Sequence, residues 1–148
     1  MVITSSREFG GILVTDIAED VAYGRMVVQE GGLKVLRELL GLSRNAMAEM
    51  LYVTPETYAN WEIFQEVQVW PQNASRIGRF YRSAMHQVEW LLEEGIDPRD
   101  IIPLHQYAIR ASMSQEALLR AYRDGELFCL DLGILGLWLY RDGGRELS

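Results

Sequence analysis

The chain has 148 residues, 49% of them hydrophobic and 24% charged, which is enough apolar content to bury a core and excludes a disordered chain. No apolar run approaches the roughly 18 residues of a membrane-spanning helix, and the first residues lack the pattern of a signal peptide, so we expect a cytoplasmic protein with no membrane partner. The formal net charge of −7 opposes attraction to polyanions, although residues 63–92 carry three arginines against two glutamates.

Glycines and prolines divide the first half of the chain into four expected helices. Ser43 is a good N-cap for the third helix. Thr54 and Pro55 start the fourth, because a proline at the first helical position loses no hydrogen bond. The first three helices cover residues 15–29, 33–40 and 44–51, and the fourth begins at 55.

The clearest helical pattern lies before Gly95. Apolar residues between positions 77 and 92 fall within one arc at about 100° per residue, which indicates an amphipathic helix. We expect Asn73 or Ser75 to cap this helix, after an irregular stretch at Trp70–Pro71. Gly95 is expected to end it.

The remainder of the chain differs in character. Two short helices are expected, at Ile102–Ala111 and Ser114–Arg123. Asp124–Gly125 then turns the chain into Leu127–Tyr140, which is rich in aromatic and aliphatic residues. This segment is typical of a β-hairpin, with its tip at Gly133–Gly136.

Residues 36–62 carry a specific pattern. It consists of a Leu-Ser helix start, a small residue at the helix crossing, apolar residues beside the turn and a Trp-Glu end: Leu42-Ser43, Ala48, Leu51, Val53 and Trp61-Glu62. This pattern resembles the XRE (Cro/lambda-repressor-like) helix-turn-helix family within residues 33–92. Tyr52 stands where the family often has glycine, and a left-handed backbone costs a residue with a side chain about 1 kcal/mol.

This resemblance implies that the second helix of the pair enters the major groove of double-stranded DNA. Asn60 would read adenine with two hydrogen bonds, Glu56 would accept from a cytosine amino group, and Thr57 would contact a thymine methyl group or a phosphate. Arg44, at the start of the supporting helix, would contact the DNA backbone. The whole reading face implied is Thr54, Pro55, Glu56, Thr57 and Asn60.

Arg76, Arg79 and Arg82 lie within about 120° of one another on the long amphipathic helix, opposite its apolar arc. Each DNA phosphate that they neutralise would add about −0.9 to the slope of log affinity against log salt. The alternative interpretation is a solvated charged stripe without a ligand.

A second pattern begins at Ile102 and includes Ala108 and the run from Ser112 to Leu127, ahead of the expected hairpin. It is similar to the winged helix of the MerR and phage excisionase group, over residues 98–142. The resemblance implies a second helix in the major groove and a hairpin that reaches the DNA backbone. The hairpin tip is apolar, so packing on the first domain or on a second subunit is an alternative. The implied contacts are Gln115, Arg120, Arg123 and Arg141.

No catalytic site, metal site or cofactor is predicted, and we do not expect an enzyme. The two histidines, His86 and His105, have no cysteine or acid at ligand spacing. The single cysteine, Cys129, lies in an apolar stretch and is expected to be a buried, reduced thiol.

The predicted fold is mainly α, with an N-terminal helix-turn-helix bundle followed by a small winged-helix-like unit and its C-terminal β-hairpin. The expected domains are a helical extension at 1–31, a lambda-repressor-like domain at 32–95 and a winged-helix unit at 96–148. The resemblances imply a phage or bacterial transcriptional regulator or repressor, acting as one chain or as a homodimer. Two alternatives stay open: an excisionase-like factor that bends DNA, and an antirepressor-like module whose acidic ends bind a protein.

Overall fold

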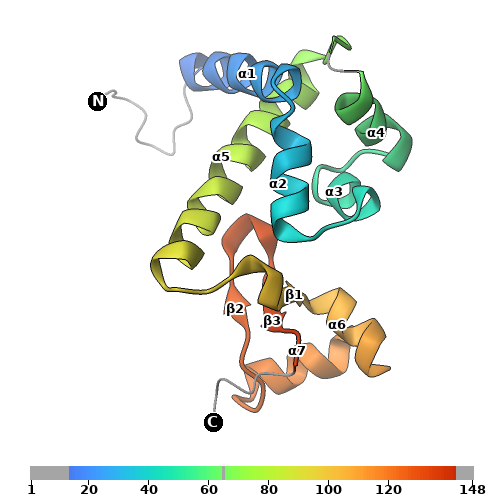
Figure 1. Ribbon diagram of the computed structural model, residues 1–148, viewed down its shortest axis with the longest axis vertical. Helices are drawn as coiled ribbons and strands as arrows, with labels where there is room; N and C mark the ends of the chain where they lie inside the picture. The colour runs from blue at the N-terminus through green and yellow to red at the C-terminus, as the bar shows by residue number, and fades with distance from the viewer. Residues whose placement is uncertain (1–13, 65, 143–148) are drawn as a thin grey trace. The chain divides into compact units, whose positions relative to one another are not determined.

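The computed structural model describes residues 14–64 and 66–142, which form seven α-helices and a small antiparallel sheet (Figure 1). The mainly helical fold class predicted from the sequence is confirmed. None of the described helices is both long and apolar enough to cross a membrane. The elements are α1 (Val14–Gln29), α2 (Gly32–Leu40), α3 (Arg44–Met50), α4 (Pro55–Ile63), α5 (Pro71–Glu93), the 3-10 turn η2 (Pro98–Asp100), β1 (Ile101–Pro103), α6 (Leu104–Ala111), α7 (Gln115–Arg123), β2 (Leu130–Asp131), the 3-10 turn η3 (Gly133–Leu135) and β3 (Leu137–Tyr140).

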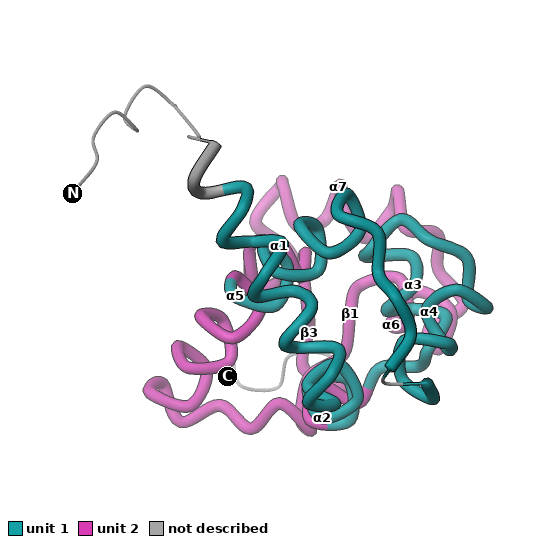
Figure 2. Tube along the Cα trace, turned by 90° about the horizontal axis from the view of Figure 1, so that it is seen from above, with its two compact units in different colours: residues 1–38, 42–82 teal, residues 39–41, 83–148 magenta. Residues whose placement is uncertain are grey.

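The chain forms two compact units, which Figure 2 colours separately. Unit 1 comprises residues 1–38 and 42–82, and unit 2 comprises 39–41 and 83–148, so α5 contributes to both. The domain boundaries expected after residues 31 and 95 remain predictions. Residues 1–13 of the expected extension lie outside the described residues, as do the last six residues of the chain.

Local capping signals start two helices of unit 1, α3 and α4. The Ser43 hydroxyl accepts a hydrogen bond from the Ala46 amide at 3.1 Å, and the Thr54 hydroxyl accepts one from the Thr57 amide at the same distance. Each bond satisfies an amide that the first turn of a helix leaves without a backbone partner. The predicted N-caps of α3 and α4 are therefore confirmed.

The predicted start of α5 is wrong. The helix begins at Pro71, and its first turn closes where the Ala74 amide donates to the Trp70 carbonyl at 2.8 Å. Asn73 and Ser75, the expected caps, lie inside the helix. Pro71 takes the first helical position, where its fixed φ favours the helix and its missing N–H costs nothing.

Two glycines allow α1 and α5 to approach closely. A Cβ atom built on Gly24 would lie 1.9 Å from the Ala74 carbonyl oxygen, and one on Gly78 would lie 2.3 Å from the Asp20 carbonyl oxygen. No side chain fits at either distance, because the neighbouring atoms are backbone. The close helix contact explains why Gly24 is present within α1, where a glycine costs about 1 kcal/mol relative to alanine.

We expect Gly24→Ala to lower the free energy of unfolding by about 2 kcal/mol, because the methyl group forces α1 and α5 apart. Helix propensity alone would change stability in the opposite direction, by about +1 kcal/mol. Urea denaturation measures the sign directly. Gln72→Ala, at an exposed position of α5, serves as the control and should stay within about 0.5 kcal/mol of the wild type. A stabilised Gly24→Ala variant would show that the helices do not meet at this residue.

Unit 2 contains a three-stranded antiparallel sheet in the order β1-β3-β2, with α6 and α7 between β1 and β2 in the chain. In the register, Ile101 pairs with Tyr140, and both Pro103 and Leu130 pair with Trp138. The expected C-terminal hairpin is confirmed, although its first strand is reduced to two residues, Leu130–Asp131.

The helix predicted from Ile102 begins too early. Ile101–Pro103 forms β1, and α6 starts at Leu104. A proline disfavours helical backbone in the residue before it, and Ile102 is β-branched, so the extended conformation is favoured. All three residues of β1 pair with residues of β3.

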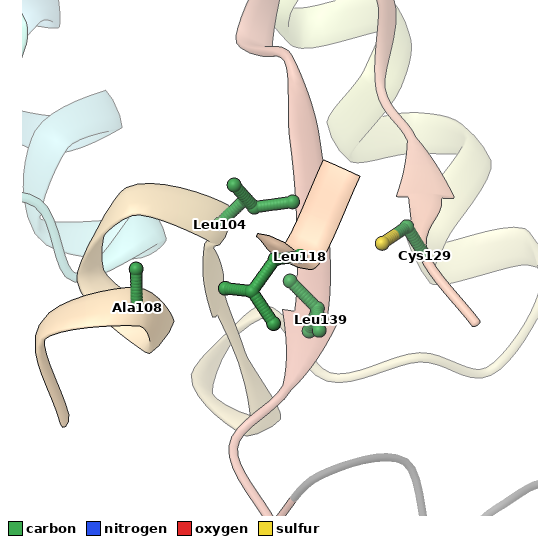
Figure 3. Close-up of a cluster of buried hydrophobic side chains, with 5 residues drawn as sticks. All are labelled: Leu104, Ala108, Leu118, Cys129 and Leu139. Atoms are coloured by element: carbon green, nitrogen blue, oxygen red, sulfur yellow. The ribbon is translucent and has the colours of Figure 1, made fainter. Parts of the chain in front are cut away.

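A cluster of buried side chains holds the helices of unit 2 to the sheet (Figure 3). Leu104 and Ala108 come from α6, Leu118 from α7 and Leu139 from β3. Cys129 completes the cluster, and burial raises the pKa of its thiol. The expectation of a buried, free cysteine is therefore confirmed.

The hairpin tip is largely buried, although it lies at the end of a hairpin. Leu132 and Leu135 are buried, and the indole Nε1 of buried Trp138 donates to the Leu135 carbonyl at 2.8 Å. Ile134 is the large hydrophobic residue of the tip that remains half exposed. Most of the apolar surface of the tip is therefore covered by the rest of the chain.

Candidate nucleic-acid interface

The first helix pair, α3 and α4, is joined by a tight turn. Tyr52 has a φ of 60°, the left-handed conformation expected from its place in the turn, and its side chain is 82% exposed. The Val53 amide donates to the Ala48 carbonyl at 3.0 Å and closes the end of α3. Ala48 and Leu51 are buried beneath the turn.

The outer side of α4 carries the reading face predicted for this pair. Tyr58 and Trp61, on the opposite side of the helix, are buried. The predicted residues therefore stand clear of the core, and Thr57 is the only one of them that is partly covered. Their exposed members are Thr54, Pro55, Glu56 and Asn60.

Glu62, at the end of α4, is the centre of a buried ionic network that sequence reasoning missed. Its side chain is 1% exposed. Arg37 donates to it from Nε at 2.6 Å and from Nη2 at 3.0 Å, and Arg44 donates from Nε at 3.1 Å. The Tyr58 hydroxyl also donates to this carboxylate. The spacing of Tyr58 and Glu62, four residues apart on the buried side of α4, is the signal that could have revealed it.

The network keeps Glu62 ionised. Burial alone would raise the pKa of this carboxyl, but hydrogen bonds from Arg37 and Tyr58 outweigh burial and hold the pKa below its usual range. Burial and the bond to Glu62 also raise the pKa of Tyr58. Arg44, predicted to contact phosphate, is thereby held at the start of α3 with its side chain 44% exposed.

The basic face on α5 is only partly available to a ligand. Arg76 donates to the Leu51 carbonyl at 3.2 Å, and its guanidinium lies 5.8 Å from the centroid of the Tyr52 ring. Arg82 forms an ion pair with Asp20 at 2.6 Å. Arg79 is exposed, and no described residue bonds to its side chain. Of the three predicted contacts, Arg79 is thus the one whose side chain has no bonding partner among the described residues, and Arg82 is the one paired with a carboxylate.

A surface hollow of about 630 Å³ lies at the C-terminal end of α4. Ile63 and Phe64 line it together with Asn60, Glu66 and Val67, and both are more than half exposed. Sequence reasoning did not single out these residues, because two apolar residues at a helix end usually indicate core.

The second helix pair, α6 and α7, belongs to unit 2. Ser112 in its turn has a φ of 55°, and the Met113 amide donates to the Ala108 carbonyl at 2.9 Å. The Ser114 hydroxyl accepts from the Ala117 amide at 3.0 Å and caps α7, which begins at Gln115, one residue after the predicted start. The predicted reading residues Gln115, Arg120 and Arg123 are all exposed along this helix.

The two helix pairs have opposite charge. Residues 44–63 contain one arginine against three glutamates, whereas residues 104–123 contain three arginines, at 110, 120 and 123, against one glutamate. No described carboxylate forms an ion pair with those three arginines. The second helix pair is therefore the more basic of the two, although it lies in a segment whose net charge is negative.

Arg141, the last predicted contact, follows β3. Its side-chain Nε donates to the Arg99 carbonyl at 2.6 Å, and the residue is exposed. This bond anchors the side chain beside η2 and leaves the rest of the guanidinium at the surface.

No protein-family model matches the chain, and neither a curated protein nor a solved structure matches it. Across residues 14–64 and 66–142, no group of three histidines, cysteines or acids is placed to hold a metal ion.

Proposed function

We propose that the chain is a sequence-specific binder of double-stranded DNA, and not an enzyme. The observation that supports this most is α7, an exposed helix with Gln115, Arg120 and Arg123 on its surface, held behind a tight turn. Such a helix suits the width of the major groove, and arginine bonds both phosphates and the guanine edge.

The order of elements in unit 2 supports the same proposal. A strand, two helices and a hairpin follow one another, which is the arrangement expected of a winged helix, and the first helix pair in unit 1 suits a lambda-repressor-like domain. A regulator of phage or bacterial transcription in the cytoplasm, acting as a repressor, would combine these parts. An excisionase-like factor would use the same helices and differ in bending its DNA.

Binding to a random-sequence duplex, measured by fluorescence anisotropy as salt is raised, tests the proposal. If Arg79, Arg110 and Arg123 each neutralise one phosphate, log affinity should fall with log salt at a slope of about −2.7. A duplex of mixed sequence is the correct probe, because phosphate contacts do not depend on base sequence. Absence of binding at salt concentrations below about 50 mM, where phosphate attraction is strongest, would contradict the proposal.

A second candidate function follows from the hollow at the end of α4. Ile63 and Phe64 expose apolar surface beside the carboxylate of Glu66, a combination that suits a partner protein with basic and apolar side chains. An antirepressor-like module would use this surface and leave α7 without a ligand. Substitution of Phe64 by alanine would then weaken capture of the partner and leave DNA affinity unchanged.

A further inference from the structure

The two helix pairs are built alike, at a constant offset of sixty residues. Tyr52 and Ser112 are the only non-glycine residues with positive φ among those described. Each turn is closed by the same bond, from Val53 to the Ala48 carbonyl in one pair and from Met113 to the Ala108 carbonyl in the other. The sequence shows little sign of this repeat, since few side chains are shared.

The capping geometry repeats at the same offset. Thr54 and Ser114 have nearly equal backbone angles, φ −73° and ψ 154° against φ −78° and ψ 151°. Each accepts a bond from the amide three residues later, at 3.1 Å and 3.0 Å. The second helices that follow, α4 and α7, are nine residues long in both pairs. Equivalent positions on the two helices can therefore be compared directly.

Exposure follows the same correspondence. Tyr58 and Leu118, the fourth residues of their helices, are both buried. Glu56 and Glu116, the second residues, are both exposed, and so are Asn60 and Arg120, the sixth residues. The second and sixth positions are four residues apart and so share one face of the helix. Each helix thus presents a glutamate and one further polar side chain on an equivalent outer face.

The chemistry of these side chains differs at one equivalent position and agrees at the other. A glutamate can accept a hydrogen bond from the amino group of cytosine. Both helices carry such an acceptor, Glu56 in α4 and Glu116 in α7. Asn60 has the groups to bond adenine at N6 and N7, whereas Arg120 has the groups to bond guanine at O6 and N7. Asn60 and Arg120 therefore carry hydrogen-bonding groups that match different bases.

We propose that one chain reads an asymmetric DNA site made of two related subsites, with Asn60 and Arg120 as the corresponding specificity-determining residues. The subsite under α4 contains adenine where the subsite under α7 contains guanine, and Glu56 and Glu116 favour a cytosine in each. This inference rests on the proposed DNA-binding function.

Parallel selections from random duplexes, with the wild type, Asn60→Arg and Arg120→Asn, test the inference. Arg120→Asn should replace the guanine of one subsite by adenine, and Asn60→Arg should replace the adenine of the other by guanine. Each variant should lose between about 5-fold and 150-fold in affinity for the wild-type site. The double variant, Asn60→Arg with Arg120→Asn, should select the wild-type bases with the two subsites exchanged. Both positions are exposed, and thermal unfolding checks that each variant is folded.

The outcomes separate the two proposals. If the wild type enriches a site but the substitutions leave every base preference unchanged, the specificity assignment is overturned and DNA binding stands. The specificity assignment is also overturned if the selected site is perfectly palindromic and only one of the two substitutions has any effect. In that case two copies of the chain would read identical half-sites, each with the same single helix. If the wild type enriches no site and binds no duplex at low salt, both proposals fail.

Discussion

Joint replacement of Arg120 and Arg123 by alanine is expected to weaken binding to the selected DNA site roughly 30-fold or more, since each arginine contact to a base or phosphate contributes at least about 1 kcal/mol. The slope of log affinity against log salt should also become shallower by about 1, because the phosphate contact of Arg123 is lost and fewer counterions are released. Both side chains are exposed on α7, and no described carboxylate competes for them. Fluorescence anisotropy with a labelled duplex measures both quantities.

Arg99→Ala is the control for this experiment. Arg99 is exposed in η2 and forms an ion pair with Asp97 at 2.8 Å, outside both helix pairs. The control substitution removes one positive charge from the same unit, where the double variant removes two. Its effect on affinity therefore reports long-range attraction per charge, which we expect to be less than about 3-fold at physiological salt. Equal losses in the Arg99 variant and the double variant would mean that α7 makes no direct contact with DNA.

Glu62→Gln is expected to destabilise the protein by about 3 kcal/mol, because removal of one partner leaves the buried charge of Arg37 uncompensated. The glutamine keeps the shape of the side chain, so the loss reports charge and hydrogen bonding rather than a cavity. Urea denaturation gives the free energy of unfolding. Glu56→Gln removes an exposed carboxylate from the same helix and should change stability by no more than about 0.5 kcal/mol. Similar effects at Glu56 and Glu62 would contradict the network.

The same pair of proteins gives a pH test. Because the folded-state pKa of Glu62 lies below its ordinary value of 4.5, its ionic contribution is complete above that value and is lost as the pH falls through the folded pKa. The stability difference between wild type and Glu62→Gln should therefore be constant from pH 7 down to about 5 and narrow in more acidic solution. A difference that stays constant into strongly acidic solution would exclude the carboxylate as its source.

Much of the helical architecture could be predicted because its signals are local. Ser43, Thr54 and Ser114 cap their own helices, and a side chain three residues from its bonding partner is visible in sequence. The start of α5 was missed although Pro71 carries the same signal as Pro55. The aromatic Trp70 before it, unlike Thr54, offers no side-chain cap, and its carbonyl alone closes the turn.

Features that depend on distant partners could not be predicted. β1 has three residues and is stabilised by pairing with β3, nearly forty residues later in the chain. Helical spacing placed three arginines on one face of α5 but could not show that Arg76 bonds the Leu51 carbonyl or that Arg82 pairs with Asp20. The likeness of the two helix pairs was hidden as well, because it resides in backbone angles and bonds.

Photo-crosslinking from α7 tests the central claim most directly. A photoreactive residue in place of Gln115, at the exposed start of α7, should crosslink the full chain to its duplex on irradiation. The same residue in place of Glu89, exposed on α5 and outside both helix pairs, is the control and should give little product. Efficient crosslinking from position 115 alone is the result that DNA reading by α7 predicts. No crosslink from position 115, or equal yields from both positions, would contradict it.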